Sequence, residues 1–192
     1  MESEIIKATI ECIEKYGIQG ATNRRIAEVA GVNSAAINYY FRHKKTLIDV
    51  CMNITLKNAF DFKNFEEMPD ASPEERCAAI FTDLIVGGLN YPNITRAHFY
   101  PLLVEGKYNT EVVKHVNRFV SELTDDLTQH GSGLARDELY LACVQGVMTV
   151  LMAVLAPDLF AGEGGIDLRE EDERQRFVAR LVERLFSGGH DD

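Results

Sequence analysis

The stretch Thr22–Phe41, TNRRIAEVAGVNSAAINYYF, decides how the rest of this chain is interpreted. It has the pattern of two short helices joined by a tight turn. Thr22 suits the N-cap of the first helix, because its hydroxyl can accept an amide hydrogen that the first turn leaves unpaired. Gly31 follows the first helix and suits the left-handed conformation that ends a helix. The pattern predicts a helix-turn-helix, whose second helix enters the major groove of DNA.

The second helix of this motif combines a cap, an inward side chain and a polar surface. Asn33 or Ser34 is expected to cap it, and Ile37 to point inward. Ala27 lies four residues before Gly31, where the two helices would cross. A larger side chain at that position would push the helices apart.

The same stretch resembles the DNA-binding head of the TetR family of transcriptional regulators. The resemblance covers residues 1–59, with the helix-turn-helix at 22–41. It implies a three-helix head, followed over 60–192 by a body that binds an effector and dimerises. The residues that carry the resemblance are Ile26, Ala27, Ala30, Gly31, Val32, Ala36, Ile37, Asn38, Tyr39, Tyr40, Phe41, Lys44 and Leu47.

Two groups of side chains are expected to meet double-stranded DNA. The first turns of the second helix place side chains against base edges. The expected base contacts are Asn33, Ser34, Asn38 and, for a thymine methyl, Ala35 or Ala36. Phosphate contacts that fix the register are expected from Thr22, Arg24, Tyr39, Tyr40 and Lys44. The resemblance supports the last three. Each residue has a plainer alternative as a cap, a core residue or a solvated side chain.

Charge is unevenly distributed along the chain. The net charge of −10 by itself argues against a nucleic-acid partner. Residues 22–45, however, carry five basic side chains against one acidic residue, Glu28. Screening limits the repulsion from an acidic body to about 8–10 Å at physiological salt, so a local basic patch still attracts phosphates.

The apolar spacing predicts an all-α protein of about nine helices, because no β-alternation, repeat or low-complexity run occurs. A three-helix head precedes a helical bundle for ligand binding and dimerisation. Gly17 is expected to end the first helix, and Pro101 to kink or split a later one. Asp167 with Glu170 is expected to form a capping-box-like start to the last helix.

The uncharged run from Leu139 to Ala156 is close to the length of a membrane-spanning helix. Polar side chains near its middle and acidic flanks favour a buried helix, with no membrane contact. Small side chains recur along one face and would let another helix approach closely. This face and the last helix are expected to pair two copies into a homodimer through Ala142, Gly146, Thr149, Ala153, Phe177, Leu181 and Leu185.

The resemblance implies a small-molecule effector whose binding favours a head spacing that no longer fits a palindromic operator, which makes repression the default. Pocket candidates are polar or aromatic side chains within apolar stretches. For each of them a core or surface role is the plainer alternative. The candidates are Arg96, His98, Phe99, Tyr100, Tyr108, His115, Tyr140, Gln145 and Met148.

Other classes of function find less support in the residues. Cys12, Cys51, Cys77 and Cys143 form no CxxC pair and are typical of small buried hydrophobes, with a redox- or metal-responsive regulator as the alternative. No metal-ligand spacing occurs, so neither a metal nor a cofactor is expected. GxSxG, HExxH and Walker motifs are absent, which argues against an enzyme.

Two expectations concern location and the main competing interpretation. The acidic start of the chain lacks the features of a signal peptide, which indicates a cytoplasmic protein. The competing interpretation is an interaction protein that keeps the helix-turn-helix fold but no longer binds DNA.

Overall fold

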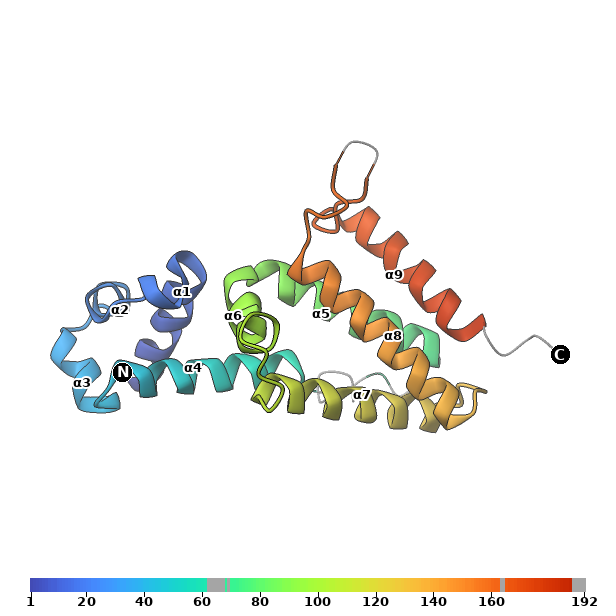
Figure 1. Ribbon diagram of the computed structural model, residues 1–192, viewed down its shortest axis with the longest axis horizontal. Coiled ribbons are helices and arrows are strands. Elements are labelled where there is room, and N and C mark those ends of the chain that lie inside the picture. Colours follow the sequence, from blue (N-terminus) through green and yellow to red (C-terminus); the bar gives the residue numbers. More distant parts are fainter. Residues whose placement is uncertain (62–67, 69, 163–164, 188–192) are drawn as a thin grey trace. The chain divides into compact units, whose positions relative to one another are not determined.

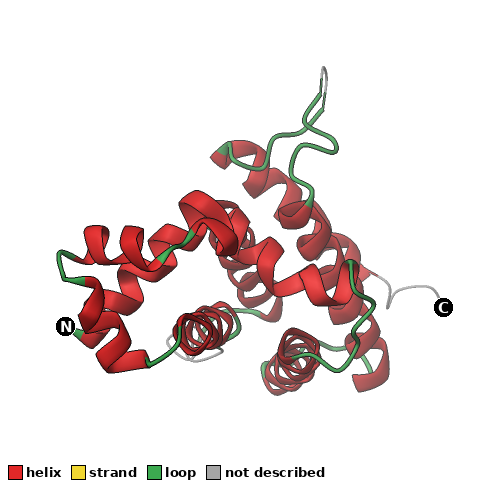
Figure 2. Cartoon of the chain, turned by 60° about the vertical axis from the view of Figure 1, so that its left-hand side comes forward, coloured by secondary structure: helices red, strands yellow, loops and turns green. Residues whose placement is uncertain are grey.

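The computed structural model describes residues 1–61, 68, 70–162 and 165–187. Within these residues the chain forms nine α-helices and no strand, as predicted (Figures 1 and 2). The helices group into two compact units: unit 1, Met1–Ala59 with Tyr91–Val112, and unit 2, Phe60–Asn90 with Val113–Asp192. The helices are α1 (Glu2–Gly20), α2 (Asn23–Ala30), α3 (Ser34–Phe41), α4 (Lys44–Ala59), α5 (Pro73–Asn90), α6 (Pro92–Leu103), α7 (Glu111–Gln129), α8 (Arg136–Leu155) and α9 (Glu171–Phe186).

The core of unit 1 lies where α1 packs against α2, α4 and α6, and where α3 packs against α2 and α4. Two helices of eight residues each are too short to bury a core alone, so the longer α1 and α4 complete it. The buried residues of this core are Ile5, Ala8, Cys12, Ile13, Ala21, Ile26, Ala27, Ile37, Phe41, Leu47, Ile48, Cys51 and Ile94.

The first helix breaks at Gly17, as predicted. Gly17 has φ 71° and ψ 169°, a conformation that interrupts the helix. One further turn follows to Gly20, and the amide of Ala21 donates to the carbonyl of Gly17 at 3.1 Å. This turn leads the chain into the N-cap of α2.

The start of α6 is fixed to α1 by a side chain. Pro92 occupies the first turn of α6, and its N-cap residue, Tyr91, makes no side-chain cap. The carboxylate of Glu14 accepts hydrogen bonds from the amides of Asn93 and Ile94, each at 3.1 Å. The side-chain amide of Asn93 donates to the carbonyl of Glu14 at 2.7 Å. Glu14 therefore caps a helix to which it does not belong.

Residues 91–112 pack with unit 1, whereas the division predicted at residue 59 assigns them to the body. Ile94 is 4% exposed and belongs to the core of unit 1. Pro101 lies inside α6 without splitting it, and the helix ends two residues later at Leu103. Periodicity shows which face of a helix is apolar but not which neighbour that face meets.

In unit 2, α5 packs against both α8 and α9, and α8 packs against α9. Two glycines mark the closest approaches. A Cβ atom at Gly88 would lie 2.7 Å from the side chain of Val154, and one at Gly146 would overlap the ring of Phe81. Glycine at these positions lets the helices approach more closely than any larger residue would.

A buried ion pair joins α5 to α7 in unit 2. The side chains of Arg76 and Asp126 are 3% and 14% exposed. The guanidinium donates to both carboxylate oxygens of Asp126, at 2.7 and 2.6 Å, and to the carbonyl of Met68 at 2.6 Å. Ser72 and Glu75 cap the start of α5 reciprocally, which places Arg76 in its first turn.

The last helix begins later than predicted. α9 starts at Glu171, and its N-cap residue, Glu170, makes no side-chain cap. The amide of Asp167 donates instead to the carboxylate of Glu173. The predicted capping box of Asp167 with Glu170 is therefore wrong, because the chain extends four residues further before it turns into the helix.

Replacing Asp126 by alanine is expected to lower the free energy of unfolding by roughly 3–5 kcal/mol, because it leaves a buried guanidinium without its counter-charge. Asp125→Ala is the matched control. Asp125 is the neighbouring residue of α7, and its side chain, paired with Arg136, is 50% exposed. We expect the control to cost under about 1 kcal/mol. Urea unfolding followed by circular dichroism measures both, and equal losses would contradict the assignment.

Candidate nucleic-acid interface

The predicted caps of the helix-turn-helix are present. The amide of Arg25 donates to the hydroxyl of Thr22 at 3.3 Å, which caps α2. Gly31 has φ 64° and ψ 29°, the left-handed conformation, and the amide of Val32 donates to the carbonyl of Ala27 at 2.9 Å. These contacts fix the turn between α2 and α3.

Of the two caps proposed for α3, Asn33 is the one used. Its side-chain carbonyl accepts the amide hydrogen of Ala35 at 2.5 Å, and α3 begins at Ser34. The side-chain carbonyl oxygen of Asn33 thereby holds one hydrogen bond within the chain, and its side-chain amide nitrogen can still donate to a base.

The recognition helix α3 has one buried face and one exposed face. Ile37 and Phe41 are buried, which fixes the rotation of the helix on unit 1. Ser34, Ala35 and Asn38 are all exposed. These three predicted base contacts therefore share the solvent-facing side of the helix, within its first two turns.

The two tyrosines at the end of α3 form an edge-to-face pair, with ring centroids 5.2 Å apart. Tyr39 is 81% exposed and Tyr40 is 40% exposed. Both rings reach solvent and contact each other, which is unusual for tyrosines that serve only to fill a core. Their phenol groups are therefore available to phosphates.

The two basic residues predicted to contact phosphates, Arg24 and Lys44, differ in their exposure to solvent. Arg24 is exposed. Lys44 is half-buried, and its ammonium group lies 3.4 Å from the carbonyl of Ile18. The Lys44 ammonium thus has a partner inside unit 1, which sequence reasoning did not reveal. Arg25 is also engaged, because it donates to the carbonyl of Gly20 at 2.8 Å.

Two exposed basic residues near the end of α3 were not predicted as contacts from the sequence. Arg42 follows the last residue of α3, and Lys45 lies in the first turn of α4. Both are exposed, and the first turn of α4 contains no acidic residue. Both contribute to the basic charge of residues 22–45, but nothing in their spacing distinguishes them from solvated charges.

The nine predicted effector residues fall in both units. Arg96, His98, Phe99, Tyr100 and Tyr108 belong to unit 1, and His115, Tyr140, Gln145 and Met148 belong to unit 2. Phe99 is buried, whereas Tyr108 is 75% and Met148 is 66% exposed. His98 makes a 3.0 Å hydrogen bond with the hydroxyl of Thr55 on α4. The pocket assignment of the whole set stays a prediction.

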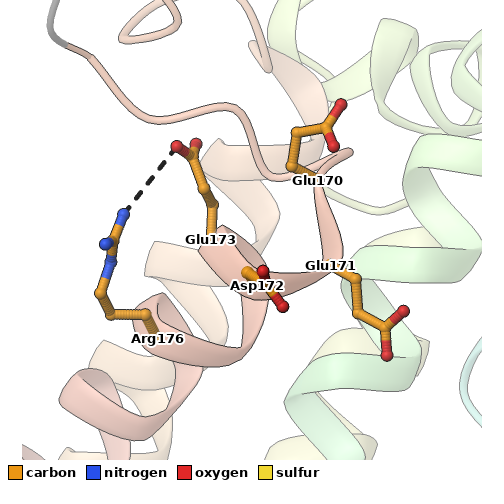
Figure 3. A pocket seen from close by; sticks show the side chains of 5 residues that line it. All are labelled: Glu170, Glu171, Asp172, Glu173 and Arg176. Carbon is orange, nitrogen blue, oxygen red and sulfur yellow. Dashed lines mark ion pairs between the residues drawn. The ribbon is translucent and has the colours of Figure 1, made fainter.

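A pocket of about 450 Å³ lies at the start of α9 and is lined by none of the nine predicted effector residues (Figure 3). Its walls are Glu170, Glu171, Asp172, Glu173 and Arg176. Figure 3 shows the carboxylates around the first turn of α9, with Glu173 and Arg176 paired at 3.9 Å. Among the described residues, no group of three His, Cys, Asp or Glu side chains is placed to hold a metal ion.

Of the predicted small-residue stripe, only Thr149 lies on the face of α8 that reaches solvent. Gly146 is buried, where a side chain would meet Phe81 and Leu185, so it packs inside the chain and is not available to a second copy. Ala142 and Ala153 are half-buried, as are the α9 residues Phe177, Leu181 and Leu185. The exposed face of α8 carries Leu141, Gln145, Met148, Thr149 and Met152.

α8 is also long and apolar enough to span a membrane by length and composition. That property is weak evidence, because core helices of soluble proteins share it. The buried side of α8 packs within unit 2 through Leu139, Cys143, Val147, Val150 and Val154.

All four cysteines are buried. Burial raises the pKa of the Cys51 thiol to about 11, and it also raises the pKa values of the Cys12, Cys77 and Cys143 thiols. A raised pKa keeps the thiol protonated at neutral pH, and the thiolate is the reactive form. The environment of these side chains therefore favours the packing role over a redox sensor.

Comparison with known families identifies the N-terminal segment. Residues 5–51 match the family of bacterial regulatory proteins called the tetR family. Over 79 residues the chain is 34% identical to the HTH-type transcriptional regulator BetI of Escherichia coli. That match spans 40% of this chain and 40% of the length of this curated relative. Residues 5–51 therefore form a domain similar to the N-terminal domain of the tetR family.

Solved structures extend the likeness to the whole fold. A transcriptional regulator of the TetR/AcrR family from Thermobifida fusca is similar over 100% of this chain and 98% of its own, with a TM-score of 0.67 and 22% identity. The transcriptional regulator FadR from Bacillus subtilis, solved with stearoyl-CoA, is similar over 99% and 100%, with a TM-score of 0.64 and 19% identity. At these identities the likeness shows the fold alone.

Replacing Gly31 by alanine is expected to lower the free energy of unfolding by about 1 kcal/mol, because its left-handed conformation is strained for any residue with a Cβ atom. Gly87→Ala is the matched control, since Gly87 lies inside α5 and a Cβ atom added there would meet nothing within 4 Å. We expect the control to raise stability by roughly 0.5–1 kcal/mol. Urea unfolding measures both, and a stabilised Gly31→Ala variant would contradict the conformation of the turn.

Proposed function

We propose that this protein is a cytoplasmic, sequence-specific DNA-binding transcriptional regulator that represses from a palindromic operator and is released by a small molecule. The observation that carries the proposal is the exposed face of α3. Its polar side chains Ser34, Asn38 and Tyr39 point to solvent from a helix whose two ends are fixed by caps and whose other face is buried. We assign the chain no catalytic step.

The charge of this surface supports the same conclusion. Arg24, Arg42 and Lys45 are exposed around the helix-turn-helix, within a segment whose only acidic residue is Glu28. Phosphate contacts supply most of the affinity of such a protein, and contacts to base edges supply its sequence preference. Both kinds of side chain are therefore available on unit 1.

A homodimer is the second part of the proposal. The exposed face of α8 presents Leu141 at 59%, Met148 at 66% and Met152 at 56% exposure. Large apolar side chains in a row on one helix are costly to leave in water and are typical of an association surface. A two-fold dimer would present two recognition helices to half-sites about one helical turn of DNA apart.

Release by a small molecule is the third part. FadR of Bacillus subtilis, which shares the fold, is solved with stearoyl-CoA. In this chain α6 is capped by Glu14 of α1 and is separated from α5 by the single residue Tyr91. A ligand that shifts α5 would act on α6 and hence on α1, so affinities for operator and effector would be reciprocally linked.

Asn38→Ala is expected to relax base preference, with a loss of about 1–3 kcal/mol of discrimination at one operator position, because a side chain that reads a base edge is removed. Fluorescence polarisation measures it, on DNA from upstream of the protein's own gene and on an operator selected from a randomised pool. Asn117→Ala is the control, since Asn117 is an exposed residue of α7.

Tyr39→Phe serves in the same experiment as a probe of the phosphate contacts. Loss of a hydroxyl group that binds a phosphate would weaken all sequences alike. Tyr108→Phe removes a comparably exposed hydroxyl group outside the helix-turn-helix and should have no effect. A folded wild-type protein that selects no sequence would contradict the proposed function.

Met148→Glu is expected to convert the dimer to a monomer of 21.6 kDa in sedimentation velocity, because it places a charge in the centre of the exposed face of α8. Asn117→Glu adds the same charge to an exposed position on α7 and should leave the dimer intact. A Met148→Glu protein that sediments as the wild-type dimer would place the interface elsewhere.

A further inference from the structure

The segment that joins the recognition helix to α4 is a strained turn centred on Arg42. Arg42 has φ 55° and ψ −49°, and it is the only residue other than glycine with positive φ in the described part of the chain. The amide of His43 donates to the carbonyl of Phe41 at 2.5 Å, which closes a three-residue γ-turn. A γ-turn with positive φ at its central residue is rare and strained.

Glycine would remove this strain, and unit 1 uses glycine at comparable positions. Gly17 and Gly31 carry the positive φ angles that end the first part of α1 and the whole of α2. At the end of α3 the chain instead has a residue with a long side chain. A strained backbone conformation at a residue other than glycine is often kept because its side chain has a function. The strain at Arg42 therefore suggests a function for the Arg42 side chain.

The side chain of Arg42 has no evident structural task. It is exposed, and within the residues that the structure describes it takes part in no ion pair. Its amide donates to the carbonyl of Asn38, so Arg42 ends the same helix that carries the proposed base contact, one turn further on. The turn therefore holds a guanidinium in water at the end of the recognition helix.

Arg42 is better placed to contact a phosphate than the neighbouring Lys44 is. Lys44 is one of the phosphate contacts predicted from the sequence, but it is half-buried, and its ammonium group lies 3.4 Å from the carbonyl of Ile18. Arg42 stands two residues before it and is exposed. Arginine also suits a phosphate better than lysine does, because its planar group can donate two parallel hydrogen bonds.

We propose that Arg42 is a DNA-backbone contact, and that the strained γ-turn is kept because it directs this guanidinium to a phosphate beside the bases read by α3. The inference rests on the proposed function, and names a binding residue that neither the motif nor the family resemblance indicated. Arg42 then lowers the stability of the free protein and raises the stability of the complex.

Three variants separate the charge from the strain. Arg42→Ala removes the charge and keeps a Cβ atom at positive φ, Arg42→Gly removes both, and Arg42→Lys keeps both the charge and the strain. Affinity is measured by fluorescence polarisation at several salt concentrations, on an operator duplex selected by the wild-type protein and on a random duplex. Stability is measured by urea unfolding, and Lys57→Ala, in the last turn of α4, is the control.

We expect Arg42→Ala and Arg42→Gly to bind both duplexes roughly five- to tenfold more weakly at physiological salt, with the salt slope reduced by about one. Arg42→Gly alone should raise the urea midpoint, because glycine adopts the turn without strain. Arg42→Lys should lose less affinity than Arg42→Ala, and Lys57→Ala should bind like the wild type.

Two results would overturn the inference in different ways. An Arg42→Ala protein with the wild-type affinity and salt slope on a selected operator would remove Arg42 from the interface while leaving the proposed function intact. A wild-type protein that binds neither duplex, even at low salt, would overturn the proposed function and Arg42 with it.

Discussion

The first turn of α6 depends on an acceptor from another helix. It begins with Pro92, and Tyr91 before it makes no side-chain cap, so the amides of Asn93 and Ile94 need a partner. The carboxylate of Glu14 accepts from both, and Ile94 then enters the core of unit 1. An uncapped, buried helix start would be costly, and this contact makes α6 part of unit 1 although α5 before it belongs to unit 2.

This arrangement gives the proposed regulation a physical path within unit 1. Only Tyr91 separates the end of α5 from the start of α6 along the chain. α6 contacts α1 through Glu14, and it contacts α4 through the hydrogen bond of His98 with Thr55 at 3.0 Å. Only two residues separate α4 from the recognition helix, and α4 packs against α3. We therefore expect a displacement of α6 to act on α3 through α4.

Predictions from the sequence succeeded where the interaction is local. Thr22, Gly31 and Asn33 act on residues within five positions of themselves, so their chemistry is readable without the fold. The predictions were less reliable where a distant segment of the chain decides which neighbour a residue contacts. Gly146 was assigned to a dimer surface because it lies in a row of small residues, yet Gly146 itself is buried against Phe81 from α5 of the same chain. Lys44 was assigned to a phosphate, and the carbonyl of Ile18 lies beside it.

The sequence by itself determined the helix-turn-helix, the all-α class and the polar surface of α3, because capping, periodicity and turn chemistry are properties of short segments. The tertiary structure decided the partners of each helix: the capping of α6 by Glu14, the buried side of α8 and the strain at Arg42. Such features depend on which surfaces meet after the chain has folded. Burial and long-range hydrogen bonding join residues far apart in sequence, and no local pattern records the pairing.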